Sequence, residues 1–397
     1  MILPRLPRSL CALTLAGALA ACGGGPEPGF ETVRIGTGAP IVIGVSTMLE
    51  GDLSTTGQAL LDAATLAGEG ISIAGHDVEF VAANDGCTVE GGATAARELV
   101  GRDGLVAVVG PSCSDPVLGA QPVYEEAGIT HISQLSTNVA TTNPEDRHPF
   151  RTFFRTAFND AIQGAEQALF VEETLDASSA FLVFEAFRYG GAGDNFRDSF
   201  TGDLVGDLGF ENEAEFPNIA SQVVDANPDV VYFSGFYPTG IPFVQTLREA
   251  GYVGPILGSD SMYDQELIDG LGELAEQELY VTLPSPPLLG SVFEDFAARY
   301  EETYGQDPTS TPFSAESFDA STAILMGLRA EGVVEESGDG IEVDLAALNE
   351  AIRNVSFDGA SGPVRFDDKG DRVAEGLTPV TVFVISDGAF EPAASAT

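Results

Sequence analysis

The sequence predicts an α/β protein built from two lobes, each with a parallel sheet covered by helices on both faces. Short apolar runs alternate with longer helical segments, which is the pattern of repeated strand–helix units. The alternation breaks near residues 158–160 and then restarts. A chain of 397 residues with 44% hydrophobic residues is long and apolar enough to form two cores.

The first part of the chain contains four predicted strands with helices between them. The strands are predicted at residues 40–45, 76–83, 104–110 and 130–133, and the helices at 58–67 and 90–100. The run 104–110 is almost continuously apolar, as expected for a strand buried on both faces. Ser114-Asp115-Pro116 then predicts a helix start, because Ser caps helix N-termini and Pro fits the first turn.

The second part of the chain repeats this alternation and then returns to the first lobe. Strands are predicted at 180–184, 229–233, 255–258, 279–282, 364–366 and 380–385, and helices at 242–250, 293–304 and 315–328. A Pro-rich crossing at 284–287 separates the strand at 279–282 from the late helices. In such sheets, ligands bind beyond the carboxyl ends of the strands, at the loops that open the next helices.

The N-terminus predicts secretion and a lipid anchor. Residues 1–9 are basic, residues 10–19 are apolar, and small residues precede Cys22, as in a secretory signal peptide of residues 1–21. The apolar stretch is shorter than the roughly 20 residues of a membrane span. Leu19-Ala20-Ala21-Cys22 resembles the bacterial lipobox, whose Cys carries the lipid. We therefore expect a flexible tether at 22–38 and a protein at the periplasm or cell surface, with membrane contact only through its anchor.

The composition is strongly acidic, with 61 Asp and Glu against 17 Lys and Arg and a formal net charge of −44. Such a field repels nucleic acids and anionic lipids, so no nucleic-acid partner is expected. Net charge speaks to solubility and not to fold, and adaptation to a saline environment accounts for it more simply than a specific cationic partner.

The cysteines predict one disulfide. Cys11 leaves with the signal and Cys22 takes the lipid, so Cys87 and Cys113 remain in a secreted chain, where paired thiols oxidise. The three His residues show no ligand spacing, so no metal site is expected. Serine-elbow and phosphate-loop motifs are also absent from the sequence, and we expect neither an enzyme nor a cofactor.

Short polar residues follow the predicted strands, where a ligand site is expected. Ser114 opens a helix after the third strand, Ser136 and Thr137 follow the fourth, and Asp260 follows the strand at 255–258. Hydroxyl and backbone N–H groups at a helix start would bind a carboxylate, and an acid facing them would bind an ammonium group. The alternatives are ordinary capping for the hydroxyls and an exposed loop acid for Asp260.

These residues lie within motifs that resemble the type I periplasmic binding proteins of branched-chain amino-acid uptake, the leucine/isoleucine/valine-binding group. The resemblance runs from about Pro40 to the C-terminus. It rests on Asn84-Asp85-Gly86-Cys87, Val109-Gly110-Pro111-Ser112-Cys113-Ser114, Tyr124-Glu125-Glu126-Ala127-Gly128-Ile129, Phe154-Arg155-Thr156 and Val231-Tyr232-Phe233-Ser234-Gly235-Phe236-Tyr237-Pro238. Cys87 and Cys113 fall where that group has a disulfide.

The resemblance implies a role for each matching residue. Ser114, Ser136 and Thr137 would bind the ligand carboxylate, Tyr189 would shield the ligand from the second lobe, and Asp260 would bind the α-ammonium in place of a Glu. Departures from the residues common in the group leave the identity of the ligand side chain undetermined. Three further site positions differ from the residues common in the group, namely Phe236 and Phe313 in place of Tyr and Thr56 in place of an aromatic residue. A shorter amide, urea-like or carboxylate ligand remains an alternative.

The resemblance also implies three crossings between the lobes, near Phe158, Pro284 and Leu377. The N-lobe would comprise 39–158 and 284–376, and the C-lobe 159–283 and 377–397. A monomer that closes about this hinge on a small molecule, and is then read by an ABC permease, is the function implied. A ligand-sensing or regulatory protein is the main alternative, with a protein partner instead of the permease. A structural role is a further alternative, and the grouping of Ser114, Thr137 and Asp260 argues against it.

Overall fold

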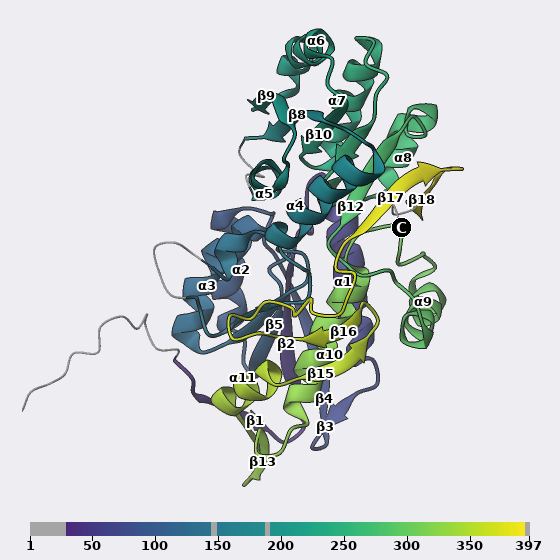
Figure 1. Cartoon of the computed structure of the whole chain (residues 1–397). Helices are drawn as coiled ribbons and strands as arrows, with labels where there is room; N and C mark the ends of the chain where they lie inside the picture. Colours follow the sequence, from purple (N-terminus) through teal and green to yellow (C-terminus); the bar gives the residue numbers. More distant parts are fainter. Residues whose placement is uncertain (1–28, 144–148, 187–190, 394–397) are drawn as a thin grey trace, which may run out of the picture.

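The computed structural model describes residues 29–143, 149–186 and 191–393, which form two α/β lobes stacked along the long axis of the molecule (Figure 1). A six-stranded sheet organises one lobe and a seven-stranded sheet organises the other. We call these the N-lobe and the C-lobe.

The N-lobe sheet is parallel apart from one edge strand. Its strands, in spatial order, are β3 (Ser72–Ile73), β4 (His76–Asn84), β2 (Ile41–Thr47), β5 (Leu105–Val109), β6 (Thr130–Ser133) and β7 (Phe153–Arg155). β3 pairs with β4 in the antiparallel direction. The sheet is covered by α1 (Ser54–Gly68), α2 (Val89–Val100), α3 (Ser114–Ala127), α10 (Ser314–Leu328) and α11 (Leu345–Arg353). In Figure 1, α2 and α3 lie on one face and α1 and α10 on the other.

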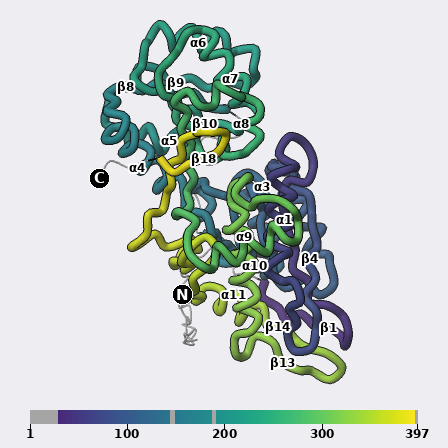
Figure 2. The backbone as a smooth tube through the Cα atoms, turned by 90° about the vertical axis from the view of Figure 1, so that its right-hand side faces the viewer, coloured from purple at the N-terminus to yellow at the C-terminus, as the bar shows by residue number. Residues whose placement is uncertain are grey.

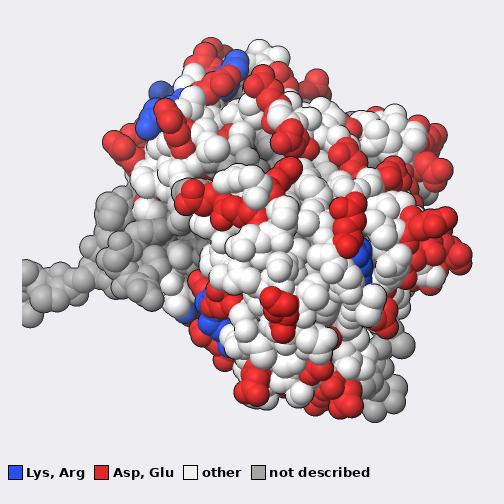
Figure 3. All heavy atoms as spheres, turned by 90° about the horizontal axis from the view of Figure 1, so that it is seen from above, with Lys and Arg blue, Asp and Glu red and all other residues white. Residues whose placement is uncertain are grey.

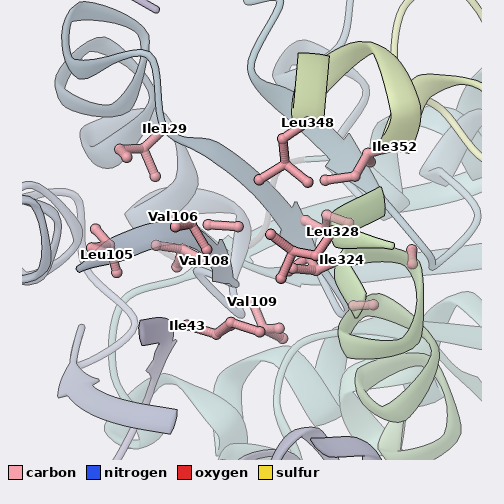
Figure 4. Packing of buried hydrophobic residues seen from close by; sticks show 14 of the residues in the cluster. Ile43, Leu105, Val106, Val108, Val109, Ile129, Ile324, Leu328, Leu348 and Ile352 are labelled. Carbon is pink, nitrogen blue, oxygen red and sulfur yellow. The ribbon is translucent and has the colours of Figure 1, made fainter. Parts of the chain in front are cut away.

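The N-lobe core forms where β5 meets helices that come from much later in the chain. Val108 and Val109 of β5 are fully buried, and Ile324 and Leu328 of α10 face the strands in the same cluster (Figure 4). Burying a side chain of this kind stabilises the fold by about 1.5–3 kcal/mol relative to leaving it exposed. The continuous apolar run of β5 is therefore explained by helices on both of its faces.

The C-lobe sheet is mixed. Its strands, in spatial order, are β18 (Ala389–Pro392), β17 (Thr381–Ser386), β12 (Leu279–Leu283), β11 (Ile256–Gly258), β10 (Val230–Ser234), β8 (Ser179–Glu185) and β9 (Asp203–Phe210). β17 pairs with β12 in the antiparallel direction, and β18 pairs with β17 in the same way. These two strands extend an otherwise parallel sheet. Its helices are α4 (Asp160–Leu169), α5 (Gly191–Ser199), α6 (Phe216–Ala226), α7 (Tyr237–Glu249) and α8 (Gln265–Leu271).

Smaller elements complete the molecule. They are β1 (Thr32–Gly36), β14 (Gly340–Asp344) and β13 (Val334–Ser337) in a three-stranded sheet, the hairpin of β15 (Ser356–Gly359) and β16 (Gly362–Arg365), and α9 (Ser291–Tyr304). Short turns of helix occur at η1 (Val139–Thr141), η2 (Phe170–Thr174), η3 (Glu213–Glu215), η4 (Asp260–Met262) and η5 (Gly272–Leu274). No helix within the described ranges is long and apolar enough to cross a membrane.

The chain passes between the two sheets three times: from β7 to α4, from β12 to α9, and from β16 to β17. Figure 2 shows the last of these as the yellow segment that rises from the N-lobe into the C-lobe. The domain limits at 158, 283 and 376 remain predictions. The breaks near Phe158, Pro284 and Leu377 also remain predictions.

A buried polar network holds the three crossings together around Glu316 on α10. The Thr156 hydroxyl donates to the Glu316 carbonyl at 2.9 Å, and the Ser285 hydroxyl donates to the Glu316 carboxylate. Arg372 donates to the Thr156 carbonyl at 2.9 Å, and Thr381 donates to the Ser285 carbonyl at 2.9 Å. Each crossing is thereby hydrogen-bonded to at least one other crossing or to α10.

Three expectations from the sequence need correction. The sheets are mixed rather than purely parallel, because β3, β17 and β18 pair at sheet edges, where an antiparallel strand needs no covering helix. The helix expected at 242–250 begins at Tyr237, with Pro238 in its first turn. Ser114 does not cap α3: Cys113 is the N-cap residue, and the Ser114 hydroxyl makes other contacts.

Candidate functional site

Two adjoining cavities lie between the lobes. With the space that is open to solvent included, the first spans about 340 Å³ and the second about 310 Å³. The polar compartment is lined by Cys87, Cys113, Ser114, Asp115, Leu135, Thr137, Phe236, Asp260 and Ser261. The apolar compartment is lined by Met48, Leu53, Thr56, Leu135, Phe236, Tyr237, Asp260, Ser261, Tyr263, Asp264, Pro312 and Phe313. Because four lining residues belong to both, we treat them as two compartments of one site.

A larger groove of about 780 Å³ lies elsewhere, on the side of the hinge formed by α4, η2 and β17. It contains none of the residues predicted from the sequence. The inter-lobe cavities are therefore the better candidate site, because ligands of doubly wound sheets bind at the carboxyl ends of the strands.

Two loops that follow neighbouring strands build the N-lobe side of the polar compartment. The Ser136 hydroxyl donates to the Ser114 hydroxyl at 3.2 Å, and the backbone N–H of Asn138 donates to the same oxygen at 3.2 Å. Arg155 is fully buried and donates to the carbonyls of Ser136 at 3.0 Å and Asn138 at 2.9 Å. Its Nε forms an ion pair of 2.5 Å with Asp371. The loop after β6 is thus held in place by a buried guanidinium.

The disulfide between Cys87 and Cys113 forms part of the same wall. The two Cα atoms are 5.4 Å apart, and both residues line the polar compartment. Cys113 is the N-cap residue of α3, so the disulfide joins the start of α3 to the segment that precedes α2. The predicted disulfide is present.

The C-lobe side is formed by residues that follow parallel strands. Phe236 is the N-cap residue of α7, just after β10, and Asp260 begins η4, just after β11. Asp260 is only 2% exposed although it is an acid. It lines the same compartment as Ser114 and Thr137.

A second buried carboxylate, that of Asp160, lies next to Asp260. Burial and the charge of Asp260 together raise the pKa of Asp160 to about 7, against the opposing effects of a hydrogen bond from Thr137 and the charge of Arg155. Its Oδ1 has no hydrogen-bond partner among the described residues. The sequence interpretation missed Asp160, although Asn159-Asp160 marks the start of a helix at the predicted break.

Hydrogen bonds cross between the lobes at the apolar compartment. The hydroxyl of Thr56 on α1 donates to the Asp264 carboxylate at 2.9 Å, and the Tyr237 hydroxyl donates to the Asp52 carbonyl at 2.9 Å. Asp264 also accepts from the backbone N–H of Glu266 as the N-cap of α8, and burial raises its pKa to about 6. The two lobes are therefore joined by hydrogen bonds near the start of α1.

The structure brings most of the predicted site residues together. Ser114, Thr137, Phe236 and Asp260 line the polar compartment, and Phe313 lines the apolar one. Ser136 is buried behind Ser114. Tyr189 and Cys22 lie outside the described residues. The ligand contacts assigned to all of these residues remain predictions, and Asp264 was not anticipated because its partner Thr56 lies 208 positions away.

The described lining of both compartments contains three carboxylates, Asp115, Asp260 and Asp264, and no Lys, Arg or His. On the face of the protein seen in Figure 3, acidic side chains far outnumber basic ones. The negative charge of the site favours a cationic group, whereas hydroxyls at the start of α3 suit a carboxylate. In the described residues, no group of three or more His, Cys, Asp or Glu is placed to hold a metal ion.

Comparison with known proteins identifies related sequences over most of the chain. A family model described as periplasmic binding protein matches residues 40–389. The leucine-, isoleucine-, valine-, threonine- and alanine-binding protein of Pseudomonas aeruginosa is 24% identical over 377 residues, covering 92% of this chain and 93% of that protein. An amino acid binding protein of the same organism is 29% identical over 243 residues, which cover 59% of this chain and 64% of that relative.

Solved structures show the same fold. A leucine-binding protein from Thermotoga maritima superposes with a TM-score of 0.78 at 25% identity, covering 89% of this chain and 98% of that one. A branched-chain amino-acid substrate-binding protein of Streptococcus pneumoniae, in complex with isoleucine, has a TM-score of 0.78 at 23% identity and covers 90% of this chain and 99% of that one.

Proposed function

This chain belongs to the periplasmic binding protein family, and we propose that it captures a small α-amino acid, branched-chain or related, between its two lobes. Members of this family are solute-binding proteins and not enzymes. The observation that carries the proposal is the polar compartment, which is lined by Ser114 and Thr137 of one lobe and by Asp260 of the other.

The two ends of an α-amino acid fit the two sides of this compartment. The hydroxyls of Ser114 and Thr137 and the N-terminus of α3 would hold the carboxylate, because donors and a helix dipole gather there without a basic side chain. Asp260 would hold the ammonium group, which compensates its buried charge. A free dicarboxylate is disfavoured, since its second charge would lie against Asp260 or Asp264.

Hinge closure is the proposed mechanism. The lobes, taken as residues 39–158 with 284–376 and 159–283 with 377–397, would open about the three crossings and close when a ligand bridges them. The contacts from Thr56 to Asp264 and from Tyr237 to Asp52 would then form only in the closed state. An ABC permease would read that closed state and receive the ligand.

The proposal also includes a lipid anchor that holds the protein at a membrane. Residues 1–21 would be removed as a signal peptide, Cys22 would carry the lipid, and residues 22–38 would tether a monomer at the periplasmic or cell-surface side of a membrane. Labelling with a radioactive fatty acid checks this part: a Cys22→Ser variant should lose the label and be released from the membrane.

Thermal unfolding with a ligand panel tests the binding function. The mature chain, residues 22–397, is refolded to remove bound solutes and screened against α-amino acids, their amides and small carboxylates. A ligand at 100 times its dissociation constant adds about 2.7 kcal/mol of stability, so binding gives a clear rise in unfolding temperature. A response to amides alone would favour the sensor alternative, and no response to any compound would contradict the proposal.

A further inference from the structure

Asp264 is a buried carboxylate at the wall of the apolar compartment. It is 1% exposed and accepts two hydrogen bonds, one from Thr56 at 2.9 Å and one from the backbone N–H of Glu266 at 3.0 Å. Among the described residues, no Lys, Arg or His forms an ion pair with it. The surroundings add negative charge, because Glu266 and Asp269 both act to raise its pKa.

A buried carboxylate that lacks a counter-charge is costly, because hydrogen bonds from neutral donors compensate only part of the lost hydration. The ammonium group of a bound α-amino acid would compensate Asp260, which belongs to the polar compartment. Asp264 lies four residues further along the chain, and its carboxylate would still need a positive charge to compensate it. Among the described residues that line the apolar compartment, no basic residue supplies one.

We propose that the ligand is an α-amino acid whose side chain is an aliphatic stem ending in a cationic group, and that Asp264 binds this group. The inference rests on the proposed function, since it needs the α-amino acid to occupy the polar compartment. Thr56 orients the Asp264 carboxylate by donating to one of its oxygens, and each oxygen retains a lone pair for the ligand.

The shape of the compartment suits such a stem. Met48, Leu53 and Phe313 provide apolar walls along which methylene groups can pack, as the stems of Lys and Arg do at protein surfaces. Asp260 and Asp264 are separated by η4 and one extended residue, so their backbones lie on the order of 9 Å apart. A stem of four carbons with a charge-assisted hydrogen bond of about 2.8 Å at each end spans a distance of this order.

A purely structural role for Asp264 predicts different behaviour. Asp264 caps α8 and joins the lobes through Thr56, and these contacts stabilise closure whatever the ligand. Loss of the contact between the lobes would therefore lower the affinity for all ligands by the same factor. Loss of a ligand-binding carboxylate would lower the affinity only for ligands with a cationic side chain, and this difference separates the two roles.

Isothermal titration calorimetry of the mature chain tests the inference, with lysine and ornithine as cationic ligands and norleucine and leucine as neutral ones. Asp264→Asn removes the charge but keeps a good N-cap residue, so α8 should still form. Thr56→Val is the matched control, because it removes the hydrogen bond between the lobes and leaves the carboxylate in place.

The wild-type chain should bind lysine or ornithine at least tenfold more tightly than norleucine. Asp264→Asn should lower the affinity for the cationic ligand at least tenfold and keep the affinity for norleucine within threefold of the wild-type value. Thr56→Val should change the affinities for both ligands by a similar factor. Binding of leucine or norleucine in preference to lysine and ornithine would overturn the inference and leave the proposed function intact. Equal losses for both ligand types in Asp264→Asn would also overturn it, and no binding of any amino acid would instead contradict the proposed function.

Discussion

The hydroxyl of Ser136 donates a 3.2 Å hydrogen bond to the hydroxyl of Ser114. The two residues follow different strands, β6 and β5, and meet because parallel strands present their carboxyl ends at one edge of the sheet. The backbone N–H of Asn138 donates to the same Ser114 oxygen, so the hydroxyl is held at the cavity wall before any ligand arrives. A donor placed in advance costs little ordering entropy on binding.

Ser114→Ala should weaken binding of the preferred amino acid by about tenfold, because it removes a hydroxyl from the proposed carboxylate site. Calorimetry on the refolded chain measures the change. Thr94→Ala is the control, since that hydroxyl bonds only to its own helix on the exposed side of α2. An affinity equal to that of the wild type would show that Ser114 serves only to order the loop after β6.

Asp260→Asn should weaken binding by more than tenfold while leaving the fold intact. The substitution keeps the shape of the side chain and removes the charge that would pair with the α-ammonium. Asp207→Asn is the control: Asp207 is an acid of an exposed ion pair with Arg197, and pairs of this kind contribute little. Unchanged affinity in the Asp260 variant would rule out the ammonium assignment.

Ligand binding should release protons near neutral pH, because the pKa of Asp160 is raised to about 7 by burial and by the charge of Asp260. An ammonium group placed nearby lowers that pKa, so the ligand displaces a proton. The association constant should then rise with pH up to about 7 and level off above it. Tyr232 is also coupled to Asp160, and it keeps its proton in this range because burial raises its pKa well above the ordinary value.

Calorimetry at pH 6.5 in buffers of different ionisation enthalpy counts the protons released. Asp160→Asn should abolish most of this release, even if its affinity is also reduced. A buffer-independent enthalpy in the wild-type chain would contradict the prediction, because it would show that no group near the site changes its protonation.

Glu316→Gln should make the stability of the protein less dependent on pH. Burial raises the pKa of Glu316 to about 7, above its ordinary value of 4.5, and the charge of Arg372 opposes this shift. Between these values the folded state binds more protons than the unfolded state, so the free energy of unfolding falls as pH rises. Urea unfolding at pH 5, 6, 7 and 8 should show a shallower decline in the variant. A residual slope is expected from Asp160 and Asp264, and an unaltered slope would refute the role of Glu316.

Replacing both Cys87 and Cys113 by Ser should lower the free energy of unfolding by about 3.5 kcal/mol, because the disulfide closes a loop of 26 residues. Urea unfolding under non-reducing conditions gives this value directly. A loss below about 1 kcal/mol would mean that the unfolded chain is already compact in this region.

The sequence alone predicted the alternation of strands and helices, the break after β7 and the pairing of Cys87 with Cys113. The alternation and the break depend on neighbouring residues, and the disulfide follows because only two cysteines remain once Cys11 and Cys22 are set aside. The apolar run of β5 needs helices on both faces, and its bounds, Leu105–Val109, lie within the predicted 104–110. Weakly apolar strands were not predicted: β9 alternates between exposed and half-buried positions, and β1 pairs with β14 some 300 residues later in the chain.

Sequence patterns were thus enough to find the strongly apolar strands and several helices, and they placed Ser114, Thr137 and Asp260 at strand ends, where parallel sheets bind ligands. The three-dimensional arrangement was needed to show that Thr56 bonds to Asp264, that the charges of Asp160 and Asp260 interact, and that Ser114 holds a loop rather than capping its helix. The physical reason is one of range. Strand and helix periodicity depends on neighbouring residues, whereas contacts between the lobes depend on how two complete sheets are positioned by three separate crossings.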